Sequence, residues 1–148
     1  MRWQKLYNPI VRWLLRSPLH GLMSGSTMLI TFYGHKSGKA YTTPVNYVWD
    51  DHTLLVVSRT DRLWWRNLRG GAPVTVYVRA QRLNGIGQVF EGEKAVEEGG
   101  LLTMLRKVPA YRRYWGVKFD ENGQPSGQEL LRVARTNALV RIGRLGSI

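Results

Sequence analysis

The sequence predicts an α+β fold, with a small β-barrel or sandwich followed by helices late in the chain. Between residues 27 and 93, apolar or weakly alternating segments of similar length follow one another with short polar turns between them, which is typical of a small barrel or sandwich. Residues 92–115 then show an interrupted helical pattern. The length of 148 residues suits one domain with one hydrophobic core.

Five segments are expected to form strands. They are TMLITFYG (27–34), AYTTPVNYVW (40–49), TLLVVSR (53–59), PVTVYVRA (73–80) and IGQVFEGE (86–93). Pro44 has no N–H for a strand ladder, which predicts an edge strand or a bulge there. Residues 50–52 supply a turn. Asn84-Gly85 predicts the turn of a hairpin between the last two segments.

An amphipathic helix is expected over residues 3–17, at the start of the chain. Asn8 followed by Pro9 resembles an N-cap with proline at the first helical position. An apolar stripe and a basic face leave two outcomes open: the helix packs on the core, or it lies on a lipid surface.

Beyond these strands the chain is expected to continue a single domain over residues 1–148. A glycine pair and a proline break the helical pattern of residues 92–115, a polar loop follows, and residues 137–145 are expected to form a closing strand. Residues 1–22 are expected to form an N-terminal helix, and residues 118–148 are expected to form an atypical C-terminal extension.

The charge of the chain is strongly positive, at +12 from 22 basic and 10 acidic residues. The first 49 residues contain six Lys or Arg and no acidic residue. Such a surplus favours an anionic partner, which can be nucleic acid, an acidic lipid surface or a phosphorylated ligand. There is no cysteine, which excludes disulfides and a cysteine nucleophile and fits a reducing cytoplasm.

The absence of several sequence signals bears on where the protein is located and what it binds. No apolar run approaches the roughly 18–20 residues of a membrane-spanning helix, and the amino terminus lacks the pattern of a signal peptide. We therefore expect a cytoplasmic protein, with peripheral membrane contact through the N-terminal helix as a further expectation. Motifs typical of nucleic-acid-binding folds are missing, so no specific nucleic-acid partner is expected. The three histidines lack the spacing of metal ligands, so no metal site is expected.

The first candidate site is a basic turn with glycine at its start and near its end, Gly34-His35-Lys36-Ser37-Gly38-Lys39. It is not a P-loop, because three residues rather than four separate the glycines and alanine follows the last lysine. The glycines free the backbone to present N–H groups, while the two lysines and the serine add donors and charge. The turn is therefore either an anion-binding nest or a basic hairpin tip.

The second candidate is SRTDRLWWRNL, residues 58–68, which follows a predicted strand. It combines Ser58, Arg59 and Asn67 with two adjacent tryptophans, Trp64 and Trp65. Adjacent side chains point in different directions, so one indole is expected to pack inward and the other to face a cleft. The segment either binds a flat heteroaromatic ring or is a surface loop anchored by one tryptophan.

The third candidate is the pair Tyr111 and Tyr114 in PAYRRYWG. Residues three apart share a helix face, so the two phenols are expected to lie together. They are either proton donors and stacking walls of a site or ordinary core tyrosines.

Taken in order, the motifs GHKSGKAYTTPVNY, LLVVSR and WWRNL resemble the deazaflavin (F420)-dependent nitroreductase family. The resemblance extends over about residues 3–117. It implies a split β-barrel related to FMN-binding and pyridoxamine-phosphate-oxidase-like proteins. It also implies an oxidoreductase that passes hydride from reduced F420 to a quinone, a nitro compound or an activated alkene, with the cofactor supplying the hydride chemistry.

By this resemblance, the basic turn holds the phosphate and acidic tail of the coenzyme. Lys36, Ser37 and Gly38 carry this role, and His35, Lys39 and Tyr41 complete that part of the cofactor site.

The resemblance assigns the rest of the cofactor site to the strands and the tryptophan segment. Pro44 shapes the neighbouring strand, and Ser58 and Arg59 approach the ring or its ribityl chain. Trp64 and Asn67 complete the cleft.

On the substrate side the resemblance implies Tyr111 and Tyr114. These two tyrosines, together with Ser58, are the candidates for donating a proton or a hydrogen bond during catalysis.

The sequence departs from the family pattern in the basic turn. His35 stands where the family has its first arginine, and Tyr41 stands where a later arginine is common. These departures leave FMN, haem or no cofactor open as alternatives to F420. They also leave open a non-catalytic cofactor-binding protein, and the net charge of +12 with its acid-free first 49 residues leaves open a basic module for membranes or nucleic acid. Split barrels often pair to complete a site, so a homodimer is a further expectation.

Overall fold

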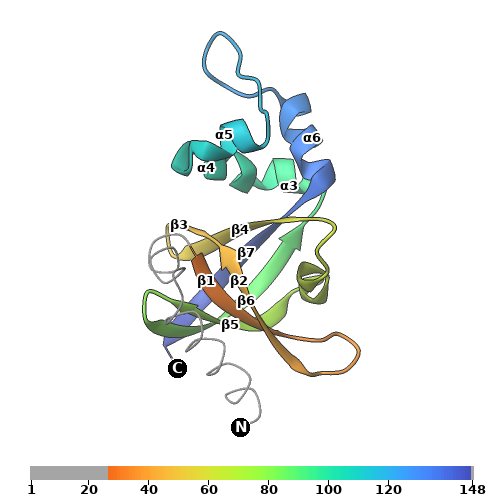
Figure 1. Ribbon diagram of the computed structural model, residues 1–148, viewed down its shortest axis with the longest axis vertical. Helices are drawn as coiled ribbons and strands as arrows, with labels where there is room; N and C mark the ends of the chain where they lie inside the picture. The colour runs from red at the N-terminus through yellow and green to blue at the C-terminus, as the bar shows by residue number, and fades with distance from the viewer. Residues whose placement is uncertain (1–26, 148) are drawn as a thin grey trace.

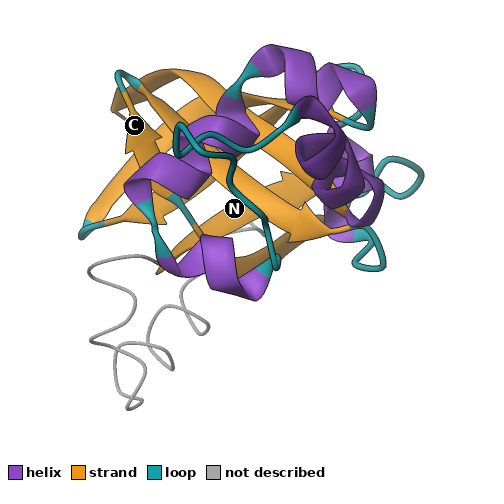
Figure 2. Ribbon diagram, turned by 90° about the horizontal axis from the view of Figure 1, so that it is seen from above, coloured by secondary structure: helices purple, strands orange, loops and turns teal. Residues whose placement is uncertain are grey.

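The structure is a computed structural model that describes residues 27–147. This part of the chain forms one curled antiparallel sheet, with helices gathered at one end of it (Figures 1 and 2). The strands are β1 (Thr27–Tyr33), β2 (Ala40–Asn46), β3 (Val48–Asp50), β4 (Thr53–Arg59), β5 (Ala72–Val78), β6 (Gln81–Phe90) and β7 (Asn137–Ser147). Their order across the sheet is β2-β1-β5-β6-β7-β4-β3. β2 lies at one edge, which confirms the edge position predicted from Pro44.

The alternation of side chains along the strands builds two apolar clusters. On β4, Leu54 and Val56 enter a cluster inside the curl of the sheet, whereas Leu55 enters a second cluster under the helices. β7 repeats this pattern, because Val140 belongs to the inner cluster and Leu139 to the outer one. Successive residues of a strand face opposite sides, so β4 and β7 each contact both clusters and hold the barrel and the helices together.

The remaining elements are short helices. They are the 3-10 helix η1 (Trp64–Leu68) and the α-helices α3 (Glu93–Glu98), α4 (Gly100–Lys107), α5 (Ala110–Tyr114) and α6 (Gly127–Thr136). The predicted interruption between α3 and α4 is confirmed: Gly99 has φ of 90°, a left-handed conformation that glycine adopts without steric cost. α6 was not predicted.

Two strand predictions were wrong in their boundaries. The β5–β6 hairpin turns at Arg79 and Ala80, which have φ of 47° and 64°, and not at Asn84-Gly85. Asn84 lies inside β6, where its Oδ1 accepts a hydrogen bond of 3.0 Å from Thr75 Oγ1. The glycine at 85 serves close packing, because a Cβ there would lie 2.9 Å from the carbonyl oxygen of Gly143 on β7.

The segment predicted as one strand over residues 40–49 is divided into β2 and β3, with a break at Tyr47. The expected closing strand is confirmed as β7, which pairs with both β4 and β6. The last strand of the chain therefore lies inside the sheet, between β6 and β4.

The N-terminal helix expected over residues 3–17, and any membrane contact through it, lies outside the described residues. Within residues 27–147, no helix is both long and apolar enough to cross a membrane.

Candidate functional site

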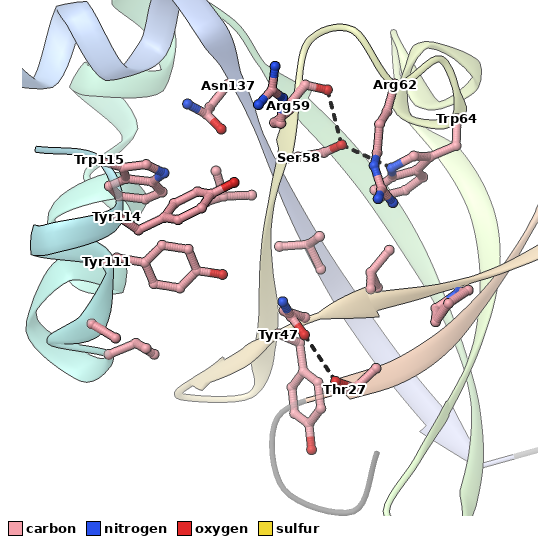
Figure 3. Close-up of a pocket in the computed structure, with 17 residues that line it drawn as sticks. Thr27, Tyr47, Ser58, Arg59, Arg62, Trp64, Tyr111, Tyr114, Trp115 and Asn137 are labelled. Carbon is pink, nitrogen blue, oxygen red and sulfur yellow. Dashed lines mark hydrogen bonds between the residues drawn. The ribbon is translucent and has the colours of Figure 1, made fainter. Parts of the chain in front are cut away.

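A cavity of about 710 Å³ opens between the edge of the sheet and α5 (Figure 3). β2 and β4 form one wall, α5 and the residues beside it form the other, and the first residue of β7 lies between them. Six residues predicted from the sequence line it: Pro44, Ser58, Arg59, Trp64, Tyr111 and Tyr114. Three separate sequence motifs therefore meet at one cavity.

Trp64 is held firmly against this cavity. It is 8% exposed, and its Nε1 donates a hydrogen bond of 3.0 Å to Ser58 Oγ at the end of β4. The Ser58 hydroxyl donates in turn to the carbonyl oxygen of Arg59, at 3.2 Å. The serine is thus engaged both as acceptor and as donor, and it positions the indole.

The two tryptophans were expected to diverge, with one of them facing a cleft. Trp64 does line the cavity. Trp65 is 2% exposed and packs in the inner cluster, and the guanidinium of Arg69 lies 5.0 Å from its ring centroid.

The basic turn is attached to η1 through Asn67. Asn67 Oδ1 accepts the backbone N–H of His35 at 2.9 Å, and its Nδ2 donates to the carbonyl oxygen of Trp64 at 3.1 Å. Aromatic contacts extend the connection, because Phe32 lies 6.0 Å from Trp64 and 5.8 Å from Tyr41 between ring centroids. The turn and the indole in the cavity wall therefore form one connected unit.

Within the turn, most backbone N–H groups are already used. Gly34 N–H donates to the Lys39 carbonyl at 2.8 Å, and Gly38 N–H donates to the Gly34 carbonyl at 2.9 Å. Lys39 N–H donates to Ser37 Oγ at 3.2 Å. No partner within the described residues takes the N–H groups of Lys36 and Ser37.

The turn residues His35, Lys36, Ser37, Gly38 and Lys39 do not line the cavity, and neither do Tyr41 and Asn67. The turn is exposed. Along β2, the four residue steps from Ala40 to Pro44 span about 13 Å at roughly 3.3 Å per step. A ligand that touches both the turn and the cavity must therefore be long.

The two tyrosines of α5 lie together, as their spacing predicted. Their ring centroids are 6.2 Å apart with an edge-to-face arrangement, and Tyr111 also packs 4.7 Å from Trp115. Burial raises the pKa of the Tyr111 phenol above its ordinary value, although the nearby Asn46 side chain opposes this shift. Tyr111 therefore keeps its proton at neutral pH. Tyr114 is 68% exposed at the mouth.

A clamp from α6 fixes the end of this short helix. Arg132 donates to the carbonyl oxygens of Trp115 and Gly116 at 3.1 and 3.0 Å. Glu129 accepts from Arg132 Nε at 2.9 Å and from the Lys118 N–H at 2.8 Å. Helix α5 has no buried residue of its own, so these contacts stabilise its position.

The charged groups in the cavity wall are basic. Asp61 accepts two hydrogen bonds from Arg59, at 3.3 and 3.1 Å, and raises the pKa of that guanidinium above its ordinary value. Tyr114 lies near the same guanidinium and adds to the shift. Arg62 also lines the cavity and forms no ion pair with any residue in 27–147. The site thus suits a ligand that carries or develops negative charge.

Sequence reasoning missed six polar or aromatic lining residues, namely Thr27, Asn46, Tyr47, Arg62, Trp115 and Asn137. Arg62 and Trp115 lie within motifs that had been singled out, so their neighbours could have indicated them. Asn137 stands where a helix joins a strand, and no motif marks it.

A curled antiparallel sheet with an aromatic, basic cavity at its edge is the arrangement expected of a split β-barrel protein. The model of the F420H(2)-dependent quinone reductase family matches residues 16–116. The chain belongs to this family. The predicted oxidoreductase class and the F420 cofactor are thereby confirmed.

Solved structures support the fold. One neighbour, described as a domain-swapped dimer, has a TM-score of 0.56 and 17% identity, over 97% of this chain and 100% of that chain. An F420-H2 dependent reductase (FDR-A) has a TM-score of 0.52 and 17% identity, over 80% of this chain and 95% of the other. HutZ, the heme storage protein from Vibrio cholerae, has a TM-score of 0.50 and 12% identity, over 96% and 94%. These likenesses confirm the predicted split barrel. Among curated proteins, no significant match is found.

Proposed function

We propose that this protein is an F420H2-dependent reductase that transfers hydride to a small electron-poor acceptor, with a quinone as the first candidate. The cavity beside the basic turn carries the proposal, because it offers a flat aromatic wall, basic groups and phenols in one place. Nitro compounds and activated alkenes are the other acceptor classes that such a site suits.

The donors left in the basic turn fit the anionic tail of F420. The N–H groups of Lys36 and Ser37 are not engaged within the described residues. Ser37 Oγ accepts from Lys39 N–H, which leaves the hydroxyl proton able to donate. The two lysines are exposed and form no ion pair with residues 27–147. We assign the phosphate and the acidic tail to these groups.

The deazaflavin ring would then reach the cavity. An extended ligand suits the separation along β2, and Trp64 supplies a rigid wall because Ser58 fixes its indole. Reduced F420, when bound, supplies the hydride.

The residues of the chain would bind the acceptor and move the proton. We assign proton donation to Tyr111 and Tyr114, since the Ser58 hydroxyl is already engaged with Arg59 and Trp64. Tyr111 is the protonated phenol of the interior, and Tyr114 closes the mouth. Arg59 and Arg62 would stabilise negative charge on the reduced acceptor.

The first experiment titrates the purified protein with F420 and, in parallel, with FMN, following ligand fluorescence and polarisation. Lys36→Ala should weaken F420 binding by about 10-fold, because it removes a charged contact to the tail. Lys94→Ala, an exposed lysine on α3, is the matched control and should bind as the wild type does. Preferential binding of FMN or haem would contradict the cofactor assignment for this chain.

The second experiment follows oxidation of F420H2 with menadione, a nitroaromatic compound and an activated alkene. Turnover with menadione supports the quinone assignment. Tight F420 binding without turnover of any acceptor would instead identify a cofactor carrier.

Two expectations remain proposals. One structural neighbour is a domain-swapped dimer, which supports a homodimer for this chain; light scattering after gel filtration would test it. A cytoplasmic location also remains a prediction.

A further inference from the structure

One end of the cavity, near Tyr114 and Arg59, carries a buried hydrogen-bond acceptor to which no described residue donates (Figure 3). Asn137, the first residue of β7, is 7% exposed and lines the cavity. Its Nδ2 donates to the carbonyl oxygen of Val133 and to Thr136 Oγ1, both at 3.1 Å. No described residue donates to its Oδ1.

The orientation of this amide follows from chemistry. A backbone carbonyl can only accept, so the nitrogen of Asn137 must face Val133, and the oxygen is left for the cavity side. Asn46, the other cavity-lining amide, differs because its Oδ1 already accepts a hydrogen bond of 3.0 Å from Thr27. A buried acceptor without a donor is unfavourable unless a ligand or water supplies one.

A cationic donor stands directly beside this acceptor. Arg59 and Asn137 are paired residues of the neighbouring strands β4 and β7, so their side chains lie on the same face of the sheet. Figure 3 shows the two side chains next to each other, above the rings of Tyr114 and Trp115. Asp61 engages Nε and Nη2 of the arginine, and Tyr114 lies near the same guanidinium. Nη1 has no ion-pair partner among the described residues.

We propose that Asn137 Oδ1 and the Arg59 guanidinium form a subsite for an N–H group flanked by a carbonyl, as in a cyclic imide. The asparagine accepts from the N–H, and the arginine donates to the neighbouring C=O. The proposal rests on the proposed reductase function and adds a substrate class to it. The same edge occurs in the pyrimidinedione ring of a deazaflavin and in imide-bearing acceptors, so the experiment has to distinguish these two sources.

Maleimide and N-methylmaleimide are the probe pair, because they are electron-poor alkenes that differ only by the N–H. Hydride adds to one alkene carbon and a proton to the other, which gives the succinimide while F420H2 is oxidised to F420. The chain has no cysteine that a maleimide would alkylate. The wild type should prefer maleimide by about 10-fold in kcat/KM, the usual effect of leaving a buried polar group unpaired.

Asn137→Leu should bring this ratio close to one. The ratio is measured on the same preparation, so a partly unfolded variant does not distort it. Arg59→Met should lower kcat/KM for both probes and leave their ratio unchanged, because both probes keep their carbonyls. N-ethylmaleimide controls for size: it should behave like the N-methyl compound if the lost N–H is the cause.

The affinity of Asn137→Leu for F420 shows whether the imide bound at this subsite belongs to the cofactor or to the acceptor. A loss of about 10-fold in F420 affinity with an unchanged maleimide ratio assigns the edge to the cofactor. A changed ratio with unchanged F420 affinity assigns it to the acceptor. The proposal is overturned if Asn137→Leu changes neither the maleimide ratio nor the affinity for F420. If this variant does not fold, the wild type provides the test. Equal kcat/KM for the two maleimides, together with equal affinity for F420 analogues with and without the imide N–H, would then overturn the proposal.

The proposed reductase function has its own readout, which is oxidation of F420H2 by the wild type with menadione. If the wild type oxidises F420H2 with none of the acceptors, binding of the two maleimides is followed through the fluorescence of Trp64 and Trp115, which line the same cavity. Tighter binding of the N–H compound would then support the subsite without the reaction, and equal binding would overturn it.

Discussion

Arg141 connects three parts of the fold that are distant in sequence. From β7 it donates to both carboxylate oxygens of Glu98 at the end of α3, each at 2.7 Å. Its Nη1 donates to Asp50 Oδ2 at 2.9 Å and to Thr53 Oγ1 at 2.7 Å in the β3–β4 hairpin. The side chains of Arg141, Glu98 and Asp50 are 22%, 11% and 31% exposed. This cluster fixes the helices on the sheet.

Replacement of Arg141 by methionine keeps most of the aliphatic stem and removes the charge. The change leaves two partly buried carboxylates close together without their cation. Removing one partner of a fully buried pair costs about 3–5 kcal/mol, and the partial exposure of this cluster lowers the expected loss to about 2–3 kcal/mol of unfolding free energy. For a chain of this length, each kcal/mol shifts Tm by about 2–4 °C, so Tm should fall by about 4–12 °C.

Thermal and urea unfolding followed by circular dichroism measure this loss. Arg59→Met is the matched control, because Arg59 also contacts a carboxylate through two nitrogens but is 64% exposed. The control should unfold like the wild type. Adding Glu98→Gln to Arg141→Met should restore part of the lost stability, since it removes the more buried of the stranded charges. If Arg141→Met loses no more stability than the control, the cluster does not stabilise the packing of the helices on the sheet.

Two further predictions concern the helices. Glu129 has a pKa lowered from 4.5 to about 2, chiefly by its hydrogen bond from Arg132. The stability that this group contributes is therefore complete above pH 4.5 and is lost as the pH falls through about 2, so unfolding of wild type and Glu129→Gln should differ at pH 6 and converge near pH 2. Gly100→Ala should destabilise by about 1–3 kcal/mol, because the added methyl group requires Leu139 to move; its Cβ would lie 2.7 Å from Leu139 Cδ2. Gly127→Ala in α6 has open space and should stabilise by about 0.5 kcal/mol, so equal effects in urea unfolding would contradict both glycine assignments.

The strands were predictable where the side-chain pattern is local. β1 and β4 occupy nearly the predicted ranges, because their apolar runs end at clear turns. The β5–β6 turn was misplaced because Arg79 and Ala80 carry no turn preference, whereas Asn84-Gly85 does. Residue 85 is glycine because β7 packs too closely against it for a Cβ. Such a packing requirement cannot be recognised in a single sequence.

Helix α6 had a local signal that was overlooked. Ser126 caps the helix by accepting the N–H of Glu129 at 3.2 Å. Serine followed three residues later by glutamate is the sequence pattern of a capping box. The position of α6 could thus have been predicted, but its contact with the end of α5 could not, because Arg132 reaches backbone carbonyls that no sequence spacing indicates.

Within the candidate site, helical spacing correctly brought Tyr111 and Tyr114 together, and their position at the cavity followed only from the fold. The basic turn was predicted as a nest of backbone N–H groups. The structure leaves two such groups, on Lys36 and Ser37, because the turn uses the others to close itself and to join Asn67. Side-chain charge therefore has a larger part in the proposed anion contact than glycine content suggested.

The two ends of the proposed site come from different parts of the sequence. The basic turn, β4 and α5 lie within the segment that matches the family, residues 16–116, whereas Asn137 and the α6 clamp follow it. Cofactor contacts and acceptor contacts can then vary independently. If the Asn137 subsite holds the acceptor, a substitution at residue 137 should alter the choice of acceptor while the turn still binds F420, whereas a substitution in the turn should weaken every acceptor reaction equally through the cofactor. Comparing Lys36→Ala with Asn137→Leu on the maleimide pair tests this division, because only the second variant should then change the ratio.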